Sequence, residues 1–251
     1  MTLHRIGRLL AAGVLGTVVG AVVMTGVAFA AATGTVHTTG APLTVRSGPS
    51  TTAAASGSVA NGGTVTISCQ IYGQSVTGTY GTSSVWDKTG SGFVADTYVY
   101  TGSDGLVAPL CGSASTCSTS GLGDPNTCAQ AVTWETTHET TSDNPNYYNL
   151  CDHVAGLAYG FPASGSVTAL AHWNAVPAAD KHGGDYDVPP GALAFFGGGD
   201  GHVMVSIGGG HFVSNDIHGN GTLTVTTIAE ISSTWGKAYL GWTQPWFQYN
   251  H

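Results

Sequence analysis

The spacing of hydrophobic and polar residues changes near the middle of the chain. Before about residue 102, short segments alternate apolar and polar residues with a period of two, which is the pattern of half-buried β-strands. These segments are Leu43–Arg46, Thr64–Ile67 and Phe93–Asp96. Turn residues such as Ser47–Ser50 separate them. The first part of the chain is therefore predicted to form a small all-β barrel.

The second part begins with helical patterns. Apolar residues recur at helical spacing, and capping residues or a glycine and a proline bound the segments. Asp124 is expected to cap the first predicted helix, which has Ala129, Val132 and Trp134 on its apolar face. The second predicted helix is Leu150–Tyr159 and the third is Ser166–Ala175.

Four predicted strands follow the helices, with glycine-rich turns between them. They are Ala192–Phe196, His202–Ile207, His211–Asp216 and Leu223–Ile228. Helices followed by an antiparallel meander predict an α+β domain in which N-terminal helices pack on the sheet. The aromatic residues near the end are expected to pack on this domain as core; they are Trp235, Tyr239, Trp242, Trp246 and Phe247.

Composition places a boundary between the two parts. Residues 112–123 are mostly small and polar and cannot bury apolar surface, so they are predicted to be a linker. This gives an N-terminal domain over 31–111 and a second domain over 124–251. Residues 1–30 have the features of a secretory signal: Arg5 and Arg8, an apolar stretch, and the small-x-small site Ala28–Ala30. The alternative is an uncleaved membrane anchor, because the apolar run approaches the length that spans a bilayer.

The small number of basic residues limits the kinds of molecule that the protein is expected to bind. Removal of the signal leaves Arg46, Lys88, Lys181 and Lys237 against 14 acidic residues. Without a basic stripe the chain cannot displace counterions from phosphates, so nucleic acid is excluded as a partner. The sequence predicts a secreted or wall-associated protein, without stable membrane association once the signal is removed, and we expect a monomer.

The five cysteines identify a candidate nucleophile. Their positions favour a Cys69–Cys111 pair before the linker and a Cys117–Cys128 pair around it, although four cysteines allow three pairings. Cys151 is left over at the predicted start of a helix. Free N–H groups and the helix dipole stabilise a thiolate there, so Cys151 is predicted to be reactive rather than an inert core thiol.

The alternation of apolar and polar residues in one predicted strand indicates which histidine could act as a general base for the Cys151 thiol. In the strand from His202, the residues Val203 and Val205 share one face and His202 lies on the other. We expect His202 to meet a thiol that a helix holds over this face. Asp216, or alternatively Asn215, would orient the imidazole.

The remaining histidines do not form a metal motif. His211, Asp216 and His218 lie close in sequence, but the chain has no His-Glu-x-x-His pattern, and such groups beside glycine turns are commonly solvated. We predict neither a metal nor another cofactor.

Two sets of motifs resemble known families. The first set resembles the bacterial SH3 domains attached to cell-wall enzymes, which implies wall binding. Its motifs are Leu43–Ser50, Trp86–Lys88, Gly92–Val94 and Thr97–Val99. The second set resembles the NlpC/P60 and CHAP superfamily of papain-like cysteine hydrolases. Its motifs are Asn149–Ala155, Ala169–Trp173, Pro190–Phe196, Gly201–Val203 and Phe212–Asp216. The resemblance implies a papain-like second domain, with Cys151 as nucleophile and His202 as base.

The match to that superfamily has departures. The NlpC pattern usually has Asp-Cys-Ser-Gly, whereas this chain has Leu150-Cys151-Asp152-His153, and the third histidine of that family would fall at Ser214. The CHAP pattern points to Asn215 as the third group, and strand alternation points to Asp216.

The predicted function is hydrolysis of an amide bond of peptidoglycan through an acyl-enzyme, by an endopeptidase or an amidase. One alternative is a wall-binding protein with a decayed hydrolase domain, and another is a peptidase that acts on proteins.

Overall fold

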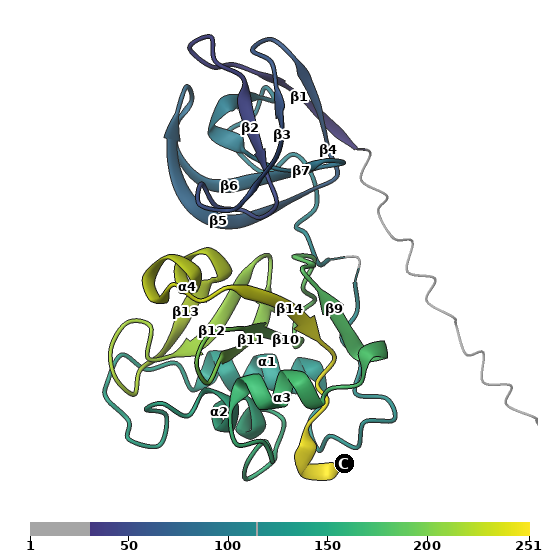
Figure 1. Ribbon diagram of the computed structural model, residues 1–251, viewed down its shortest axis with the longest axis vertical. Helices are drawn as coiled ribbons and strands as arrows, with labels where there is room; N and C mark the ends of the chain where they lie inside the picture. Colours follow the sequence, from purple (N-terminus) through teal and green to yellow (C-terminus); the bar gives the residue numbers. More distant parts are fainter. Residues whose placement is uncertain (1–30, 114) are drawn as a thin grey trace, which may run out of the picture.

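The computed structural model describes residues 31–113 and 115–251, so the predicted signal 1–30 lies outside the described residues. The described chain is a mixed α/β protein with three antiparallel sheets and four α-helices (Figure 1). None of these helices has the length and apolar character needed to cross a membrane.

Two of the sheets form from the strands that precede residue 101. Their strand orders are β4-β1-β8 and β3-β2-β7-β6-β5. The strands are β1 (Ala32–Val36), β2 (Leu43–Arg46), β3 (Ala55–Val59), β4 (Thr64–Ile67), β5 (Cys69–Gly78), β6 (Gly81–Thr89), β7 (Gly92–Ala95) and β8 (Val99–Tyr100). The predicted strands at 43–46 and 64–67 are confirmed, and the third is β7, which begins one residue earlier than expected. In β2 the apolar Leu43 and Val45 are buried and enter the core of these sheets.

The third sheet has six strands in the order β13-β12-β11-β10-β14-β9. They are β9 (Lys181–Gly183), β10 (Leu193–Phe196), β11 (His202–Gly208), β12 (His211–Asn215), β13 (Leu223–Thr227) and β14 (Tyr239–Thr243). The α-helices are α1 (Cys128–Thr137), α2 (Cys151–Ala158), α3 (Ala169–Ala175) and α4 (Ile228–Trp235).

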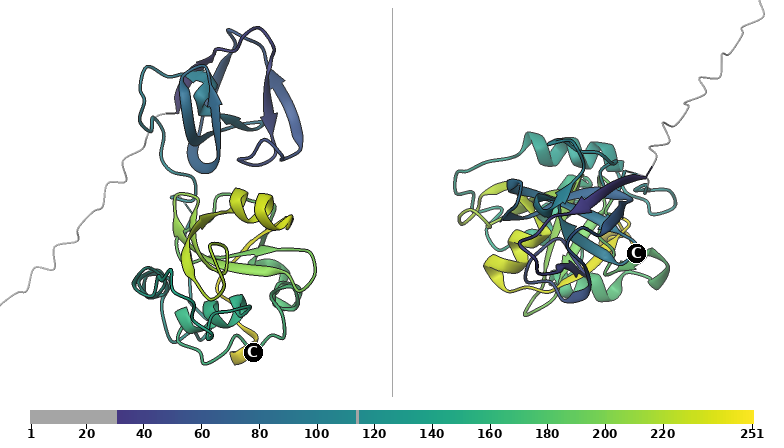
Figure 2. Two further views of the ribbon diagram at one scale, coloured as in Figure 1. Left: turned by 90° about the vertical axis from the view of Figure 1, so that its left-hand side faces the viewer. Right: turned by 90° about the horizontal axis from the view of Figure 1, so that it is seen from above.

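Helices cover both faces of the six-stranded sheet (Figures 1 and 2). On one face, Val203 and Val205 of β11 pack in a core with residues of α1, α2 and α3. On the other face, Met204 packs with Ile228 and Ile231 of α4. Apolar residues on both faces explain why β10, Leu-Ala-Phe-Phe, is buried along its whole length.

The helix boundaries differ from the expected ones where a threonine caps a helix. Helix α1 begins at Cys128 rather than after Asp124, because Thr127 and Gln130 form a capping box. Helix α3 begins at Ala169 behind the cap Thr168. The predicted strand 223–228 ends at Thr227, whose side chain accepts from the N–H of Glu230 and so starts α4.

The cysteines and the terminal aromatics follow the prediction. Disulfides join Cys69 to Cys111 and Cys117 to Cys128. The expected aromatic core is confirmed for the buried Trp242, Trp246 and Phe247, and the side chains of Trp235 and Tyr239 are partly buried against it.

The residues predicted to be a linker are fastened to the C-terminal part of the chain. Besides the second disulfide, the Ser118 N–H donates to Gln244 Oε1 at 2.8 Å, and Asn250 Nδ2 donates to the Leu122 carbonyl at 2.6 Å. The strands before residue 101 contact the third sheet through β5: the Tyr72 and His211 rings lie 4.7 Å apart.

Glu135 of α1 provides a test of the core. Its side chain is 1% exposed, and Oε2 has no hydrogen-bond partner among the described residues. Burial raises the pKa of Glu135 well above its usual value, and the charge of Glu139 adds to this effect. The pKa of Glu135 is higher in the folded protein than in the unfolded chain. Its protonated carboxyl therefore contributes fully to the free energy of unfolding below the unfolded pKa, and this contribution is lost as pH rises toward the folded pKa. We therefore expect Glu135→Gln to gain stability over the wild type between pH 5 and 8, by at most about 1.4 kcal/mol per pH unit.

Urea unfolding at several pH values measures this difference. The comparison variant is Glu139→Gln, which removes an exposed carboxylate just beyond the end of α1 but leaves the Glu135 carboxyl in place. An equal pH dependence in the wild type and in Glu135→Gln would contradict a buried neutral carboxyl.

Candidate active site

Cys151 lines a cavity in the C-terminal part of the chain that has a volume of about 750 Å³. Cys151 is free and half-buried. The cavity wall comes from the start of α2, the loop that leads into α3, the turn before β11, the end of β12, and the end of α4 with the segment after it. All lining residues lie between Tyr148 and Lys237, so the two N-terminal sheets contribute none of them.

Backbone geometry places Cys151 as the first residue of α2. The preceding residue, Leu150, is in a non-helical conformation, and no side chain of the described residues caps the helix there. Asn149 has a φ of 57°, in the left-handed region that a non-glycine residue rarely adopts. Its N–H donates to Asp216 Oδ2 at 2.8 Å. Asp216 thus holds the turn that delivers the thiol to the cavity.

Burial dominates the electrostatics of this thiol. It raises the pKa of Cys151 to about 12, and the neighbouring Asp152 carboxylate also raises it. The backbone N–H groups of Val203 and Asp152 act on the sulfur in the opposite direction. Desolvation of the sulfur therefore opposes the stabilisation of a thiolate that the helix start favours, and the predicted reactivity of Cys151 stays a prediction.

The alternation predicted for β11 is confirmed, but the helix lies on the other face. Val203 and Val205 face α2, whereas His202 shares its face with Met204 and α4. The ring of His202 meets Trp235 of α4 edge-on, with 4.9 Å between the ring centroids. Cys151 and His202 therefore approach the cavity from opposite faces, at the end of the sheet.

Gly201 permits this close packing at the start of β11. Its φ is 78°, and a side chain there would lie 2.7 Å from the Leu170 nitrogen of α3 and 2.9 Å from the Phe196 carbonyl oxygen. Only glycine satisfies both demands at this position.

Ser214, rather than Asp216 or Asn215, contacts the imidazole. His202 Nε2 lies 2.8 Å from Ser214 Oγ, and Ser214 Oγ donates its single proton to the Asn215 carbonyl at 3.1 Å. With its proton on that carbonyl, the hydroxyl accepts from Nε2–H. In this arrangement His202 is the Nε2–H tautomer, and Nδ1 has the free lone pair.

The imidazole is as strongly desolvated as the thiol. Burial lowers the pKa of His202 to about 3, and the positive charge of Lys237 contributes in the same direction. At neutral pH the site therefore rests as a thiol and a neutral imidazole, not as an ion pair.

The two predicted orienting residues have other partners, for a backbone reason. Asp216 has a φ of 67°, so the strand ends before it and the alternation that would have placed its side chain beside His202 stops at Asn215. The Asp216 carboxylate accepts from the N–H groups of Asn149 and Gly221 and from Asn215 Nδ2. Asn215 Nδ2 also donates to the Tyr147 carbonyl at 2.6 Å.

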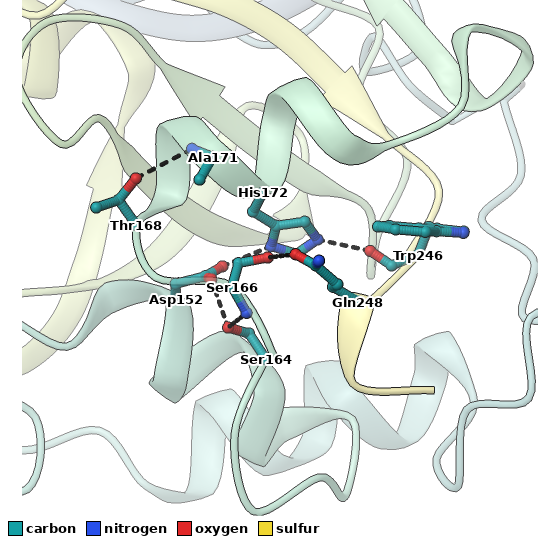
Figure 3. Close-up of polar contacts among 8 residues, drawn as sticks. All are labelled: Asp152, Ser164, Ser166, Thr168, Ala171, His172, Trp246 and Gln248. Carbon is teal, nitrogen blue, oxygen red and sulfur yellow. Dashed lines mark hydrogen bonds and ion pairs between the residues drawn. The ribbon is translucent and has the colours of Figure 1, made fainter. Parts of the chain in front are cut away.

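A polar cluster beside the thiol had no signal in the sequence. Asp152, which follows Cys151, binds His172 of α3 and the hydroxyl of Ser164 (Figure 3). His172 had no evident partner along the chain, because Asp152 is twenty residues away and the contact depends on how α2 and α3 pack.

The described residues bring one possible set of metal ligands together, namely Cys69, Cys111 and Asp187. Its two sulfurs form a disulfide and cannot act as thiolate ligands. His218 instead contacts Thr224 and Glu230. The prediction that the protein needs no metal stays a prediction.

Comparison with known proteins gives one sequence family and two distant structural likenesses. The uncharacterized proteins YraJ and YraI of Bacillus subtilis strain 168 are 46% and 44% identical to this chain over 81 residues. The match covers 29% of this chain in both cases, and 69% of YraJ and 68% of YraI. No family model matches the chain.

Among solved structures, NlpC2 and NlpC1 of Trichomonas vaginalis are each 14% identical to this chain, with TM-scores of 0.35 and 0.32. The alignments cover 87% of this chain and 74% and 70% of those proteins. At these TM-scores the likeness carries no weight for the function.

The electrostatics of Cys151 predict an unusual alkylation profile. Because its pKa is raised to about 12, the rate with iodoacetamide should climb steadily through pH 9 without reaching a plateau. Mass spectrometry of the labelled protein measures the rate, with Cys151→Ser as the control that takes up no label while the disulfides are intact. A plateau below pH 8 would show instead that the thiolate is already formed at rest.

Proposed function

The chain belongs to the family of the Bacillus subtilis proteins YraJ and YraI, and from its Cys151 site we propose that it is a secreted cysteine hydrolase that cleaves an amide bond of bacterial peptidoglycan. The observation that carries the proposal is that a free thiol at a helix start and a buried imidazole of defined tautomer line one cavity. Motifs that resemble NlpC/P60 and CHAP hydrolases support amide hydrolysis. Those that resemble bacterial SH3 domains support the cell wall as the target.

Catalysis begins with proton transfer from a neutral pair. His202 Nδ1 takes the proton of Cys151 as the sulfur attacks the scissile carbonyl carbon, since Nε2 is committed to Ser214. Because both groups are desolvated, the thiolate forms only as the carbon–sulfur bond forms. The imidazolium then gives its proton to the leaving amine, and water hydrolyses the thioester.

The start of α2 stabilises the oxyanion. The N–H of Cys151 is one of the first N–H groups of the helix, which have no intrahelical acceptor, and it points to the end where negative charge is favoured. A carbonyl oxygen bound there gains a hydrogen bond as its charge develops in the tetrahedral intermediate.

The disulfides support export. Two bonds, Cys69–Cys111 and Cys117–Cys128, are typical of proteins that work in an oxidising compartment. The predicted signal 1–30 is consistent with this location.

The primary test compares the mature protein with Cys151→Ala on purified peptidoglycan under mildly reducing conditions. We expect the wild type to release new amino groups and soluble fragments, and the variant to release none, because the nucleophile is gone. Fragment masses then distinguish an endopeptidase from an amidase. If neither protein releases fragments from several wall types and both sediment with the wall, the chain is a binding protein and the proposal fails.

Ser214 is proposed to orient His202, so Ser214→Ala should lower kcat by about 10- to 100-fold with little change in KM. The alanine removes the acceptor that selects the Nε2–H tautomer. Kinetics of fragment release measure the effect. Ser206→Ala is the matched control, since Ser206 is a buried serine on the neighbouring strand whose hydroxyl donates to the Val188 carbonyl. Equal losses in both variants would point to a general packing defect.

A further inference from the structure

The polar cluster around Asp152 joins residues from four parts of the chain (Figure 3). Asp152 lies in the first turn of α2, and Ser164 lies in the loop before α3. His172 comes from α3, and the Trp246 carbonyl comes from the segment after β14. The side chain of His172 is fully buried and that of Asp152 nearly so.

Both ring nitrogens of His172 face oxygen acceptors. Nδ1 lies 2.6 Å from Asp152 Oδ1, and Nε2 lies 2.6 Å from the Trp246 carbonyl oxygen. A carbonyl oxygen can only accept, so Nε2 carries a proton. The short Nδ1–Oδ1 contact holds a second proton, which belongs on the imidazole because a carboxylate is ordinarily the weaker base. Ser164 donates to the other carboxylate oxygen, so that oxygen acts as an acceptor.

We propose that His172 is held as a buried imidazolium whose ion pair with Asp152 positions the start of α2 and cancels the negative charge next to the Cys151 thiol. His172 is thus a positioning residue, which acts on the nucleophile through Asp152. Its importance for catalysis rests on the proposed function, but the ion pair and its effect on the thiol do not.

Charge balance explains why the pair matters at this place. The titratable groups that line the cavity are Tyr148, Cys151, Asp152, His153, Asp200, His202, Asp216 and Lys237. Asp152 is the carboxylate adjacent in sequence to the thiol, and its negative charge opposes formation of a thiolate. In a desolvated site an unpaired carboxylate would act strongly over this short distance. A cation on the far side of the same carboxylate offsets that effect without touching the sulfur.

The mechanical role follows from the same contacts. Asp152 is bound from two directions, by α3 and by the 161–168 loop, while His172 is also bound to the segment after β14. The first turn of α2 therefore cannot rotate about its axis without breaking an ionic hydrogen bond in the interior. Such contacts are costly to lose because the remaining charge stays buried.

The protonation state is tested directly on the wild-type protein by nitrogen NMR of the histidine side chains. We expect one imidazole, assigned to His172 by its absence in His172→Gln, to carry protons on both nitrogens at pH 8, where free histidines are neutral. A singly protonated His172 ring at this pH would overturn the proposal, whatever the protein does to peptidoglycan.

The effect on the thiol is tested by iodoacetamide labelling of Cys151, which needs no substrate. At pH 8 we expect His172→Gln to label about tenfold more slowly than the wild type, the loss caused by a one-unit rise in thiol pKa. The double variant Asp152→Asn/His172→Gln removes the uncompensated charge and should recover the wild-type rate. Ser164→Ala is the control, because it deletes a hydrogen bond to the same carboxylate but leaves the ion pair.

The outcomes separate charge from structure. Recovery in the double variant together with a small effect of Ser164→Ala supports the charge balance. A double variant that labels as slowly as His172→Gln, or an equal loss in Ser164→Ala, would mean that the cluster only maintains packing and would overturn it. Absence of wall hydrolysis with these labelling results intact would sink the proposed function and leave the ion pair standing.

Discussion

The first turn of α2 packs against the end of β11, and the chemistry of the site depends on this contact. The packing removes both the Cys151 thiol and the His202 imidazole from solvent. Their pKa values move in opposite directions, to about 12 and about 3, so both groups rest in their neutral forms. The remaining polar contacts then have a common purpose. Each one fixes where a proton sits, holds the backbone that carries the thiol, or offsets the charge next to the sulfur.

Three separate hydrogen-bond systems hold this arrangement. Ser214 fixes the tautomer of His202, and Asp216 fixes the left-handed turn at Asn149 before the helix. The Asp152–His172 pair fixes the helix from behind. All three depend on the six-stranded sheet, whose buried faces leave little freedom for the side chains at its end. The N-terminal sheets contribute no residue to the cavity wall.

The sequence allowed Cys151 and His202 to be predicted as candidate nucleophile and base, but not the contacts around them. Cys151 stood out because four of the five cysteines could pair, and His202 stood out because alternation in β11 separates it from the valines. Ser214 was missed because strand alternation was carried one step past Asn215, where the positive φ of Asp216 ends the strand. That conformation depends on the Asn149 and Gly221 N–H groups, which reach Asp216 only in the folded chain.

Longer-range pairings were beyond sequence reasoning for a similar reason. The contact of Asp152 with His172 requires the relative placement of two helices, and neither residue has a partner at helical spacing. Helix α4 was not predicted, because Ile228 was taken as the last residue of the preceding strand and the Thr227 cap was not recognised. Patterns of period and capping are local, whereas the groups that act on this thiol come from α2, β11 and the segment after α4.

A neutral resting site also suits the compartment in which the chain is proposed to work. Thiolates are the form of cysteine that oxidants attack, and an exposed low-pKa thiol would be vulnerable outside the cell. Burial keeps Cys151 protonated, and the cost is that a base must be present at the moment of attack. His202 meets this need only if its proton stays on Nε2, and Cys151 can ionise only if Asp152 does not add an uncompensated charge. Burial of the proposed nucleophile thus creates a need for a base and for charge compensation. Ser214 meets the first need by orienting His202, and His172 meets the second by pairing with Asp152.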